Sequence, residues 1–257
     1  MKLTAYQMDI VWENAEANYK KVEKFAAIAA EKDSRVFVLP EMFPTGFTMN
    51  ISVSAEERNG KTMSFLSKLS RKLEMYIIGG LTLNGEGGKG INTAVVFNDA
   101  GELVSEYAKT HLFRFAGEDI NHIAGNGPSI FKIDDMTFSI QICYDLRFPE
   151  IFRKNVEKIY SYIVMASWPA SRQMHWDTLL RARAIENQSY VIGVNRVGSD
   201  GNNDYTGGSV IYDSYGNVVS IAQDNNESLV IGEISVDSVK EIRNKYPFLK
   251  DRKIFHI

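Results

Sequence analysis

Three side chains that could carry out covalent catalysis occur where apolar runs of the sequence end. They are Glu41, Lys109 and Cys143, and they are separated by 68 and 34 residues, so only the fold could bring them together. A free thiol is mostly protonated at neutral pH and needs a base before it attacks a carbonyl carbon. A carboxylate can act as that base, and an ammonium can favour the thiolate and then stabilise an oxyanion. These three groups are sufficient for acyl transfer from an amide.

The elements that must position these groups alternate between strand and helix patterns. Strands are expected at 1–10, 35–39, 76–81, 93–97, 103–108, 136–143, 160–166, 190–194, 209–212, 218–221 and 229–234, and helices near 19–29, 66–73, 149–156, 176–184 and 236–245. Asn14 is a plausible cap for the first helix. Two helix pairs over two packed sheets would bury this pattern as a four-layer αββα sandwich. A three-layer, doubly wound sheet fits the periodicity as well.

Composition indicates one α/β domain over residues 1–257, without a linker or repeat. The chain is 44% hydrophobic and 24% charged, with a formal net charge of -3, and so shows no basic surface for nucleic acid or anionic lipid. A single cysteine excludes an internal disulfide and a cysteine-built metal site. No apolar run reaches the ~20 residues of a membrane span, and none at the start is typical of a signal peptide. We therefore expect a soluble, cytoplasmic protein that acts on a small molecule.

Three local segments contain the candidate residues. They read Leu-Pro-Glu-Met-Phe at 39–43, Lys-Thr-His-Leu-Phe at 109–113 and Cys-Tyr-Asp-Leu-Arg-Phe-Pro at 143–149. In this order they resemble the signature blocks of the nitrilase superfamily of carbon–nitrogen hydrolases. The resemblance covers nearly the whole chain. It implies a nitrilase-like αββα sandwich with a Glu-Lys-Cys triad and no metal or organic cofactor.

The resemblance also implies a role for each matching residue. Glu41 would be the general base, Cys143 the nucleophile and Lys109 the cation that stabilises the oxyanion. Glu118 matches the second glutamate of the family, which would orient Lys109 and the substrate. The backbone N–H of Tyr144 would complete the oxyanion hole beside Lys109.

Longer stretches narrow the resemblance to one branch of the superfamily. True nitrilases typically have Trp-Glu after the cysteine, whereas Tyr-Asp follows here, as in the amidase branches. The stretches 109–118, 167–170, 182–188 and 193–198 are similar to the bacterial ω-amidases, which hydrolyse 2-oxoglutaramate and 2-oxosuccinamate. This branch implies a small-molecule amide substrate. Another amidase of the superfamily, acting on a carbamoylated amine or a peptide-like amide, remains an alternative.

A 2-oxo-acid amide has a carboxylate that its pocket must bind. Arginine suits this task because its planar guanidinium can bond both oxygens. The candidates near the signature segments are Arg114, Arg147, Arg172 and Arg196, of which we favour Arg114 and Arg172. Trp168 and Phe43 are expected to form walls of the acyl pocket, although large aromatic residues are more often part of the core.

Two other interpretations of the cysteine remain. A Cys-His hydrolase would use His111 or His175, but His111 is two residues from Lys109 and is better suited to a supporting hydrogen bond. A non-catalytic binding or assembly module would keep Cys143 as an inert core thiol. Either alternative would make the triad irrelevant.

The resemblance further implies a homodimer of αββα units. The C-terminal stretch 246–249, with Ile254 and Phe255 beyond it, is apolar for a chain end. Such a segment could pack on a partner subunit or on its own domain. The sequence does not distinguish the two.

Overall fold

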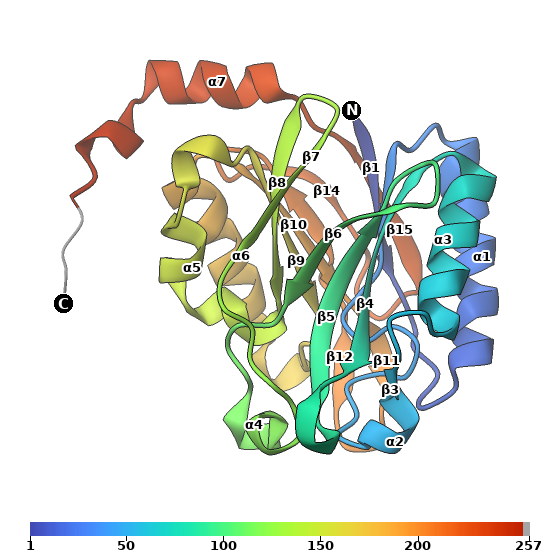
Figure 1. Cartoon of the computed structure of the whole chain (residues 1–257). Coiled ribbons are helices and arrows are strands. Elements are labelled where there is room, and N and C mark those ends of the chain that lie inside the picture. The colour runs from blue at the N-terminus through green and yellow to red at the C-terminus, as the bar shows by residue number, and fades with distance from the viewer. Residues whose placement is uncertain (254–257) are drawn as a thin grey trace.

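A computed structural model describes residues 1–253 as two β-sheets packed face to face, with helices on both outer faces (Figure 1). Ile254 and Phe255 lie outside the described residues. The two sheets and their helices form the expected four-layer αββα sandwich, so the three-layer alternative is wrong.

The first sheet has the strand order β15-β1-β2-β4-β5-β6, and β3 pairs with β4 at one end. Its strands are β1 (Lys2–Gln7), β2 (Val36–Val38), β3 (Ala55–Glu56), β4 (Tyr76–Asn84), β5 (Gly90–Phe97), β6 (Leu103–Ala108) and β15 (Ser228–Glu233). Strands β1, β2 and β4 run parallel, while β5, β6 and β15 pair antiparallel with their neighbours. The parallel strands β1, β2 and β4 therefore end at one edge of the sheet.

The second sheet has the order β14-β13-β10-β9-β8-β7. Its strands are β7 (Ser129–Ile133), β8 (Met136–Ile142), β9 (Ser161–Ala166), β10 (Tyr190–Asn195), β13 (Val210–Tyr212) and β14 (Val218–Ile221). Strands β8, β9 and β10 are parallel, so their carboxyl ends also meet at one edge. A separate hairpin is formed by β11 (Val197–Ser199) and β12 (Asp204–Thr206).

Two pairs of helices cover the outer faces of the sandwich, and the other helices lie at its ends (Figure 1). They are α1 (Ala15–Glu31), α2 (Ile51–Ser54), α3 (Lys61–Leu73), α4 (Glu118–Asn121), α5 (Pro149–Arg153), α6 (Gln173–Asn187) and α7 (Val236–Lys245). Helices α1 and α3 lie on the first sheet, and α5 and α6 on the second (Figure 1). The Asn14 side chain accepts a hydrogen bond from the Ala17 N–H at 3.1 Å, which confirms the expected cap of α1.

Side chains along a buried strand point alternately to the two faces of its sheet. The first sheet therefore contributes to two cores, one between the sheets and one under α1 and α3. In β2, Val36 and Val38 face the core between the sheets, whereas Phe37 packs under α1 and α3. Both faces of the strand are covered, so all three side chains are fully buried. A run of consecutive apolar residues is the sequence pattern of such a doubly covered strand.

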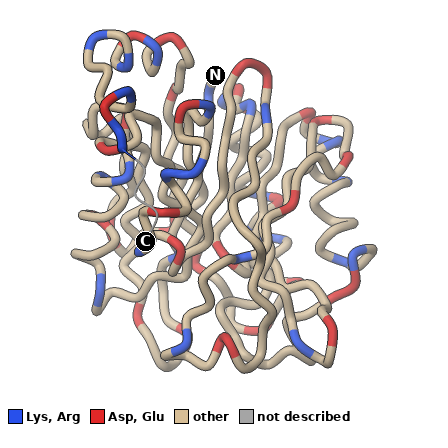
Figure 2. The backbone as a smooth tube through the Cα atoms, turned by 60° about the vertical axis from the view of Figure 1, so that its left-hand side comes forward, with Lys and Arg blue, Asp and Glu red and all other residues tan. Residues whose placement is uncertain are grey.

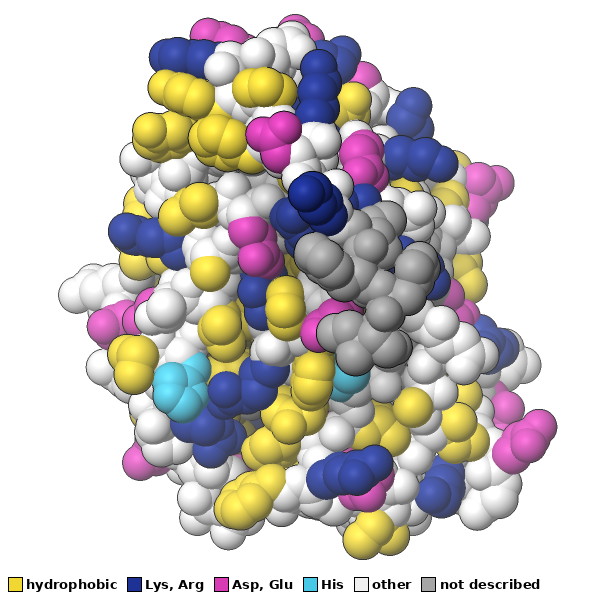
Figure 3. All heavy atoms as spheres, turned by 90° about the vertical axis from the view of Figure 1, so that its left-hand side faces the viewer, with side chains coloured by type: hydrophobic (Ala, Val, Ile, Leu, Met, Phe, Trp, Pro, Cys, Tyr) yellow, Lys and Arg dark blue, Asp and Glu magenta, His cyan; other side chains and the backbone are white. Residues whose placement is uncertain are grey.

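The surface is mixed in charge and polarity. Lys and Arg alternate with Asp and Glu around the backbone, and no side of the view is dominated by one sign (Figure 2). The face turned forward in Figure 3 likewise mixes apolar, basic and acidic side chains. Within residues 1–253, no helix is long and apolar enough to cross a membrane. The C-terminal stretch lies partly on its own chain, since Gln188 Nε2 donates to the Tyr246 carbonyl at 2.7 Å.

Candidate active site

The ends of three strands bring the candidate residues to one place between the sheets. Glu41 follows β2, Lys109 follows β6, and Cys143 follows β8 in the opposite sheet. Gly80 in β4 allows the Glu41 backbone to approach, because a Cβ at this position would lie 2.9 Å from the Glu41 Cα. The Lys109 N–H donates to the Asn92 carbonyl at 2.8 Å, which continues the pairing of β5 with β6.

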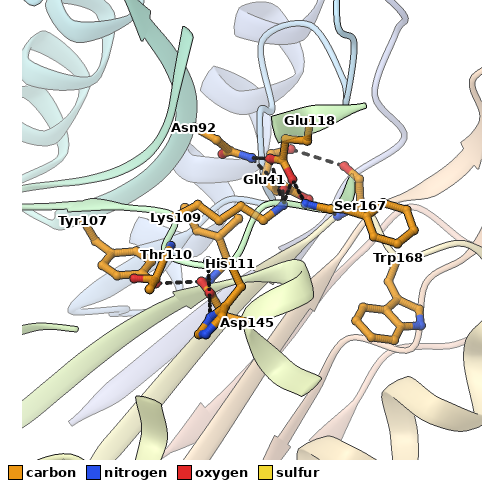
Figure 4. A network of polar contacts seen from close by, with 12 residues as sticks. Glu41, Asn92, Tyr107, Lys109, Thr110, His111, Glu118, Asp145, Ser167 and Trp168 are labelled. Atoms are coloured by element: carbon orange, nitrogen blue, oxygen red, sulfur yellow. Dashed lines mark hydrogen bonds and ion pairs between the residues drawn. The ribbon is translucent and has the colours of Figure 1, made fainter. Parts of the chain in front are cut away.

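The Lys109 ammonium lies between two carboxylates, and all three side chains are fully buried (Figure 4). Its Nζ is 2.9 Å from Glu41 Oε1, and 3.0 and 2.9 Å from the two oxygens of Glu118. The Phe113 N–H also donates to Glu118 Oε2, at 2.6 Å. These contacts fix the Lys109 side chain in one orientation.

Two further donors hold the carboxylate of Glu41. Asn92 Nδ2 donates to Glu41 Oε1 at 2.8 Å and to Glu118 Oε1 at 2.9 Å. The Ser167 N–H, after β9, donates to Glu41 Oε2 at 2.9 Å. Neither Asn92 nor the Ser167 backbone was identified from the sequence, because an asparagine within a strand pattern and a backbone N–H carry no local signal.

Electrostatics keep this cluster charged. Burial alone would lower the pKa of Lys109, but the charges of Glu118 and Glu41 outweigh it and raise that pKa above its usual value. Burial would raise the pKa of Glu118, but the Lys109 charge and the hydrogen bonds from Phe113 and Asn92 lower it instead. An ammonium and an ionised Glu118 are thus the stable forms at neutral pH.

Cys143 begins a tight 3₁₀ turn at the end of β8, and it is partly buried. Its φ of 47° lies in the left-handed region, which costs a non-glycine residue on the order of 1–3 kcal/mol. Burial, together with the Glu41 charge, raises the pKa of the thiol, while Lys109 lowers it. The protonated thiol is therefore the favoured resting form of Cys143.

Asp145 fixes the turn that carries Cys143. Its Oδ2 accepts from the Ile142 N–H at 2.9 Å and from the Tyr107 hydroxyl at 2.7 Å. Its Oδ1 accepts from the His111 N–H at 2.9 Å, and the His111 ring Nδ1 is 2.8 Å away. Asp145 is fully buried, so these contacts link the segment after β6 to the turn after β8 (Figure 4).

A cavity of about 380 Å³ opens in front of Cys143. Cys143, Tyr144 and Ser167 lie on its lining, together with aromatic residues that include Phe47, Phe113 and Trp168. This volume is within the range of small-molecule sites. The cavity thus reaches the thiol, and the charged cluster lies behind it.

Two arginines and one aspartate give the cavity its charge. Arg147 lies over the Trp168 ring at 4.7 Å, and Arg172 lies over the Phe113 ring at 5.4 Å. Among residues 1–253, neither guanidinium pairs with a carboxylate. Asp200 is held by the Tyr205 hydroxyl, which donates to it at 2.5 Å.

Comparison with known proteins places the chain in a family. Residues 2–244 match the family model described as carbon-nitrogen hydrolase. The chain belongs to the carbon–nitrogen hydrolase family.

Curated relatives of this carbon–nitrogen hydrolase match it over nearly its full length. An ω-amidase of Yersinia enterocolitica, YafV, is 36% identical over 99% of this chain and 98% of its own. A 2-oxoglutaramate amidase of Bacillus subtilis is 34% identical over 97% of this chain and 96% of its own. These matches place the chain in the ω-amidase branch of the nitrilase superfamily.

A solved structure supports the same assignment. XC1258 of Xanthomonas campestris is described as a CN-hydrolase superfamily protein with an arsenic adduct in the active site. It superposes with a TM-score of 0.93 at 32% identity, over 100% of this chain and 98% of its own. The chain is therefore a hydrolase of carbon–nitrogen bonds with the nitrilase fold.

Two expected pocket residues of this hydrolase lie elsewhere, which corrects their proposed place. The Arg114 side chain is 88% exposed and lies 3.9 Å from Asp119, outside the cavity, because its short 3₁₀ turn directs it to solvent. Phe43 is fully buried in the core under α1 and α3, where its ring lies 6.3 Å from Tyr19. Arg172 and Trp168 do line the cavity.

The two histidines of the alternative dyad have other partners. His111 stacks on Phe148 at 3.9 Å and contacts Asp145, as expected for a supporting hydrogen bond. The His175 ring lies 3.3 Å from the Arg147 guanidinium and is exposed. Among the charged groups around Cys143, the Glu41 carboxylate has the largest effect on the pKa of the thiol. In the part of the chain described, no three His, Cys, Asp or Glu side chains cluster to hold a metal ion.

Proposed function

We propose that this protein hydrolyses the terminal amide of small 2-oxo-acid amides, such as 2-oxoglutaramate and 2-oxosuccinamate, to the 2-oxo acid and ammonia. The single observation that carries the proposal is the buried Glu41–Lys109–Glu118 cluster behind the only cysteine, at the base of a cavity with two arginines. The relatives named ω-amidase and 2-oxoglutaramate amidase support this substrate class.

Formation of a thioester is the first half of the proposed reaction. Glu41 accepts the thiol proton while the Cys143 sulfur bonds to the amide carbon, and the carbonyl oxygen becomes an oxyanion. Glu41 then gives the proton to the amide nitrogen, the carbon–nitrogen bond breaks, and ammonia leaves. Covalent catalysis of this kind divides one difficult step into two easier ones.

Hydrolysis of the thioester is the second half. Glu41 takes a proton from water, the water oxygen bonds to the acyl carbon, and the carbon–sulfur bond breaks. The proton returns to sulfur, and the 2-oxo acid leaves. Glu41 ends each half-reaction in its starting form.

Lys109 and the Tyr144 N–H are the proposed donors to the oxyanion. At rest, the Lys109 ammonium donates to three carboxylate oxygens and to no other group within the described residues 1–253. When Glu41 becomes protonated it loses its negative charge and binds Lys109 less strongly. We infer that this frees one ammonium N–H for the oxyanion in the transition state, when it is needed.

Substrate binding is assigned to the lining of the cavity. Arg147 and Arg172 are the proposed partners of the substrate carboxylate, and Trp168 forms a wall. The Trp168 loop is held by Asn195, whose Oδ1 accepts from the Trp168 N–H at 2.8 Å. In place of Arg114, we therefore propose Arg147 beside Arg172.

A substrate panel with ammonia release tests this function. It compares 2-oxoglutaramate, 2-oxosuccinamate, glutamine, a simple aliphatic amide and a carbamoylated amine, with Cys143→Ser as the inactive control. The proposal predicts the highest kcat/KM for one of the 2-oxo-acid amides. A preference for the carbamoylated amine would instead indicate another branch of amidases, and no release from any compound would favour the non-catalytic module.

We also propose a homodimer that works in the cytoplasm. Helix α6 exposes Met174 by 68% and Ile185 by 50%, which is apolar surface suited to a second subunit. A lone cysteine, which cannot form an internal disulfide, agrees with a reducing compartment. Light scattering tests the dimer, and cell fractionation tests the location.

A further inference from the structure

Asn92 lies at the centre of the charged cluster although it carries no charge. It is fully buried in β5, and its Nδ2 donates to Glu41 Oε1 at 2.8 Å and to Glu118 Oε1 at 2.9 Å. The amide nitrogen has two protons, so both are used. The amide cannot be turned around, because its oxygen would then face two carboxylate oxygens.

These bonds make the two oxygens of Glu41 unequal. Oε1 accepts from both Asn92 and the Lys109 ammonium. Among residues 1–253, the one donor to Oε2 is the Ser167 N–H, at 2.9 Å. A carboxylate oxygen accepts about two hydrogen bonds, so Oε2 retains the capacity to take a proton.

We propose that Asn92 is a positioning residue that holds the Glu41 and Glu118 carboxylates side by side and directs the Cys143 proton to Glu41 Oε2. This inference rests on the proposed function, in which Glu41 is the base. Asn92 acts through the two carboxylates, and it is not among the residues that line the cavity.

The physical reason is the charge balance of the site. Two buried carboxylates share one ammonium, which leaves one negative charge in excess. Two carboxylates that share one site repel each other, which favours protonation of one of them. The two N–H groups of Asn92 stabilise the carboxylates without adding charge. A second lysine at this position would add a positive charge and make the carboxylate a weaker base.

Two carboxylates accept from the Asn92 amide, those of Glu41 after β2 and Glu118 in α4. Lys109, His122 and Cys143 interact electrostatically with one or both of these carboxylates. His122 is 2% exposed, and burial lowers its pKa. The neutral ring is therefore the favoured form at neutral pH, so His122 adds no positive charge to the cluster.

Two substitutions separate the donor from the charge. Asn92→Leu keeps a similar shape and removes both N–H groups. Asn92→Asp removes them and adds a third carboxylate. The matched control is Asn98→Asp: Asn98 Nδ2 also donates to a carboxylate, that of Glu102 at 2.8 Å, but in an exposed turn after β5.

The first readout is the pH profile of kcat and KM for 2-oxoglutaramate. At pH 7, Asn92→Leu should lower kcat at least about 10-fold while KM stays within about threefold, since only the base is affected. The acidic limb of the profile should move to higher pH, by about one pH unit or more for Asn92→Asp. Asn98→Asp should match the wild-type protein. If Asn92→Asp does not fold, the pH profile of Asn92→Leu alone is sufficient for the test.

The second readout does not require the natural substrate. Acrylamide adds to a cysteine when the thiol proton is removed, and intact-mass spectrometry follows the adduct on the single cysteine of the chain. In the two Asn92 variants, the acidic limb of the rate of addition should move to higher pH, as predicted for the acidic limb of turnover. A shift in addition without amide turnover by the wild-type protein would reject the proposed function and retain the role of Asn92.

Two results would overturn the inference. One is an acidic limb that stays in place in both Asn92 variants while the rate falls equally at every pH and the melting temperature drops, as for a residue that only supports the fold. The other is a large rise in KM at unchanged kcat, as for a residue that contacts substrate.

Discussion

The Asp145 carboxylate accepts a hydrogen bond from the His111 backbone N–H at 2.9 Å and lies 2.8 Å from the ring nitrogen of the same residue. His111 is two positions after Lys109, and Asp145 is two positions after Cys143. One buried carboxylate therefore joins the segment that carries Lys109 to the turn that carries Cys143.

Asp145→Asn should impair both stability and turnover. The new amide places an N–H opposite a donor, either Ile142 N–H or His111 N–H, and a buried donor without a partner costs about 1–3 kcal/mol. We expect a lower melting temperature and a fall in kcat of about 10-fold or more. Asp119→Asn, at an exposed position in α4, is the matched control and should change neither. A variant of Asp145 that kept both wild-type values would show that this link is dispensable.

Lys109→Arg should abolish most activity even though it keeps the charge. The planar guanidinium is too large for the compact position between Glu41 and Glu118. Loss of an oxyanion donor typically lowers kcat by about 10²–10³-fold. Steady-state ammonia release measures this, with Lys154→Arg at an exposed position as the control. Wild-type turnover by the Lys109 variant would exclude the proposed role of the ammonium.

The sequence predicted which strands precede the candidate residues, but it predicted fewer of the contacts between their side chains. Glu41, Lys109 and Cys143 were identified because each ends an apolar strand pattern and lies in a motif. Glu118 rested on the resemblance alone, and the structure places it against Lys109.

What the sequence could not predict depends on side-chain direction in space. Asn92 occurs in a strand of mostly apolar residues, and only the three-dimensional fold shows that its side chain meets two carboxylates. Phe43 comes two residues after Glu41, yet it points to the opposite core. The short strands β3, β11 and β12 lack a periodic pattern, because two or three residues are too few to show one.

Arg147→Met and Arg172→Met should weaken binding of 2-oxo-acid amides selectively. A hydrogen bond to a charged group contributes about 1.5–3 kcal/mol, so KM should rise about 10-fold or more for 2-oxoglutaramate. The kcat/KM for a simple aliphatic amide, which has no carboxylate, should be nearly unchanged. Arg114→Met outside the cavity serves as the control. An unchanged KM in the double variant would remove both arginines from the binding site.

Alkaline pH should destabilise the wild-type protein more than Cys143→Ser. Burial and the Glu41 charge raise the pKa of the folded thiol well above its ordinary value. Above pH 9 the unfolded thiol ionises while the folded one keeps its proton, so unfolding releases a proton and stability falls as pH rises. The unfolding free energy of the wild-type protein, relative to that of Cys143→Ser, should fall by up to about 1.4 kcal/mol per pH unit between pH 9 and 10. Urea titrations at each pH measure it, and parallel curves for the two proteins would contradict the raised pKa.

The most direct measurement is rapid-quench mass spectrometry of the intact protein during turnover of 2-oxoglutaramate. The account predicts a transient mass increase equal to one acyl group on the single cysteine, formed together with one equivalent of ammonia. The adduct should be absent from Cys143→Ser, and neither adduct nor ammonia should form at an appreciable rate in Glu41→Gln. Ammonia release at the wild-type rate by Cys143→Ser, with no acyl adduct on either protein, would contradict it.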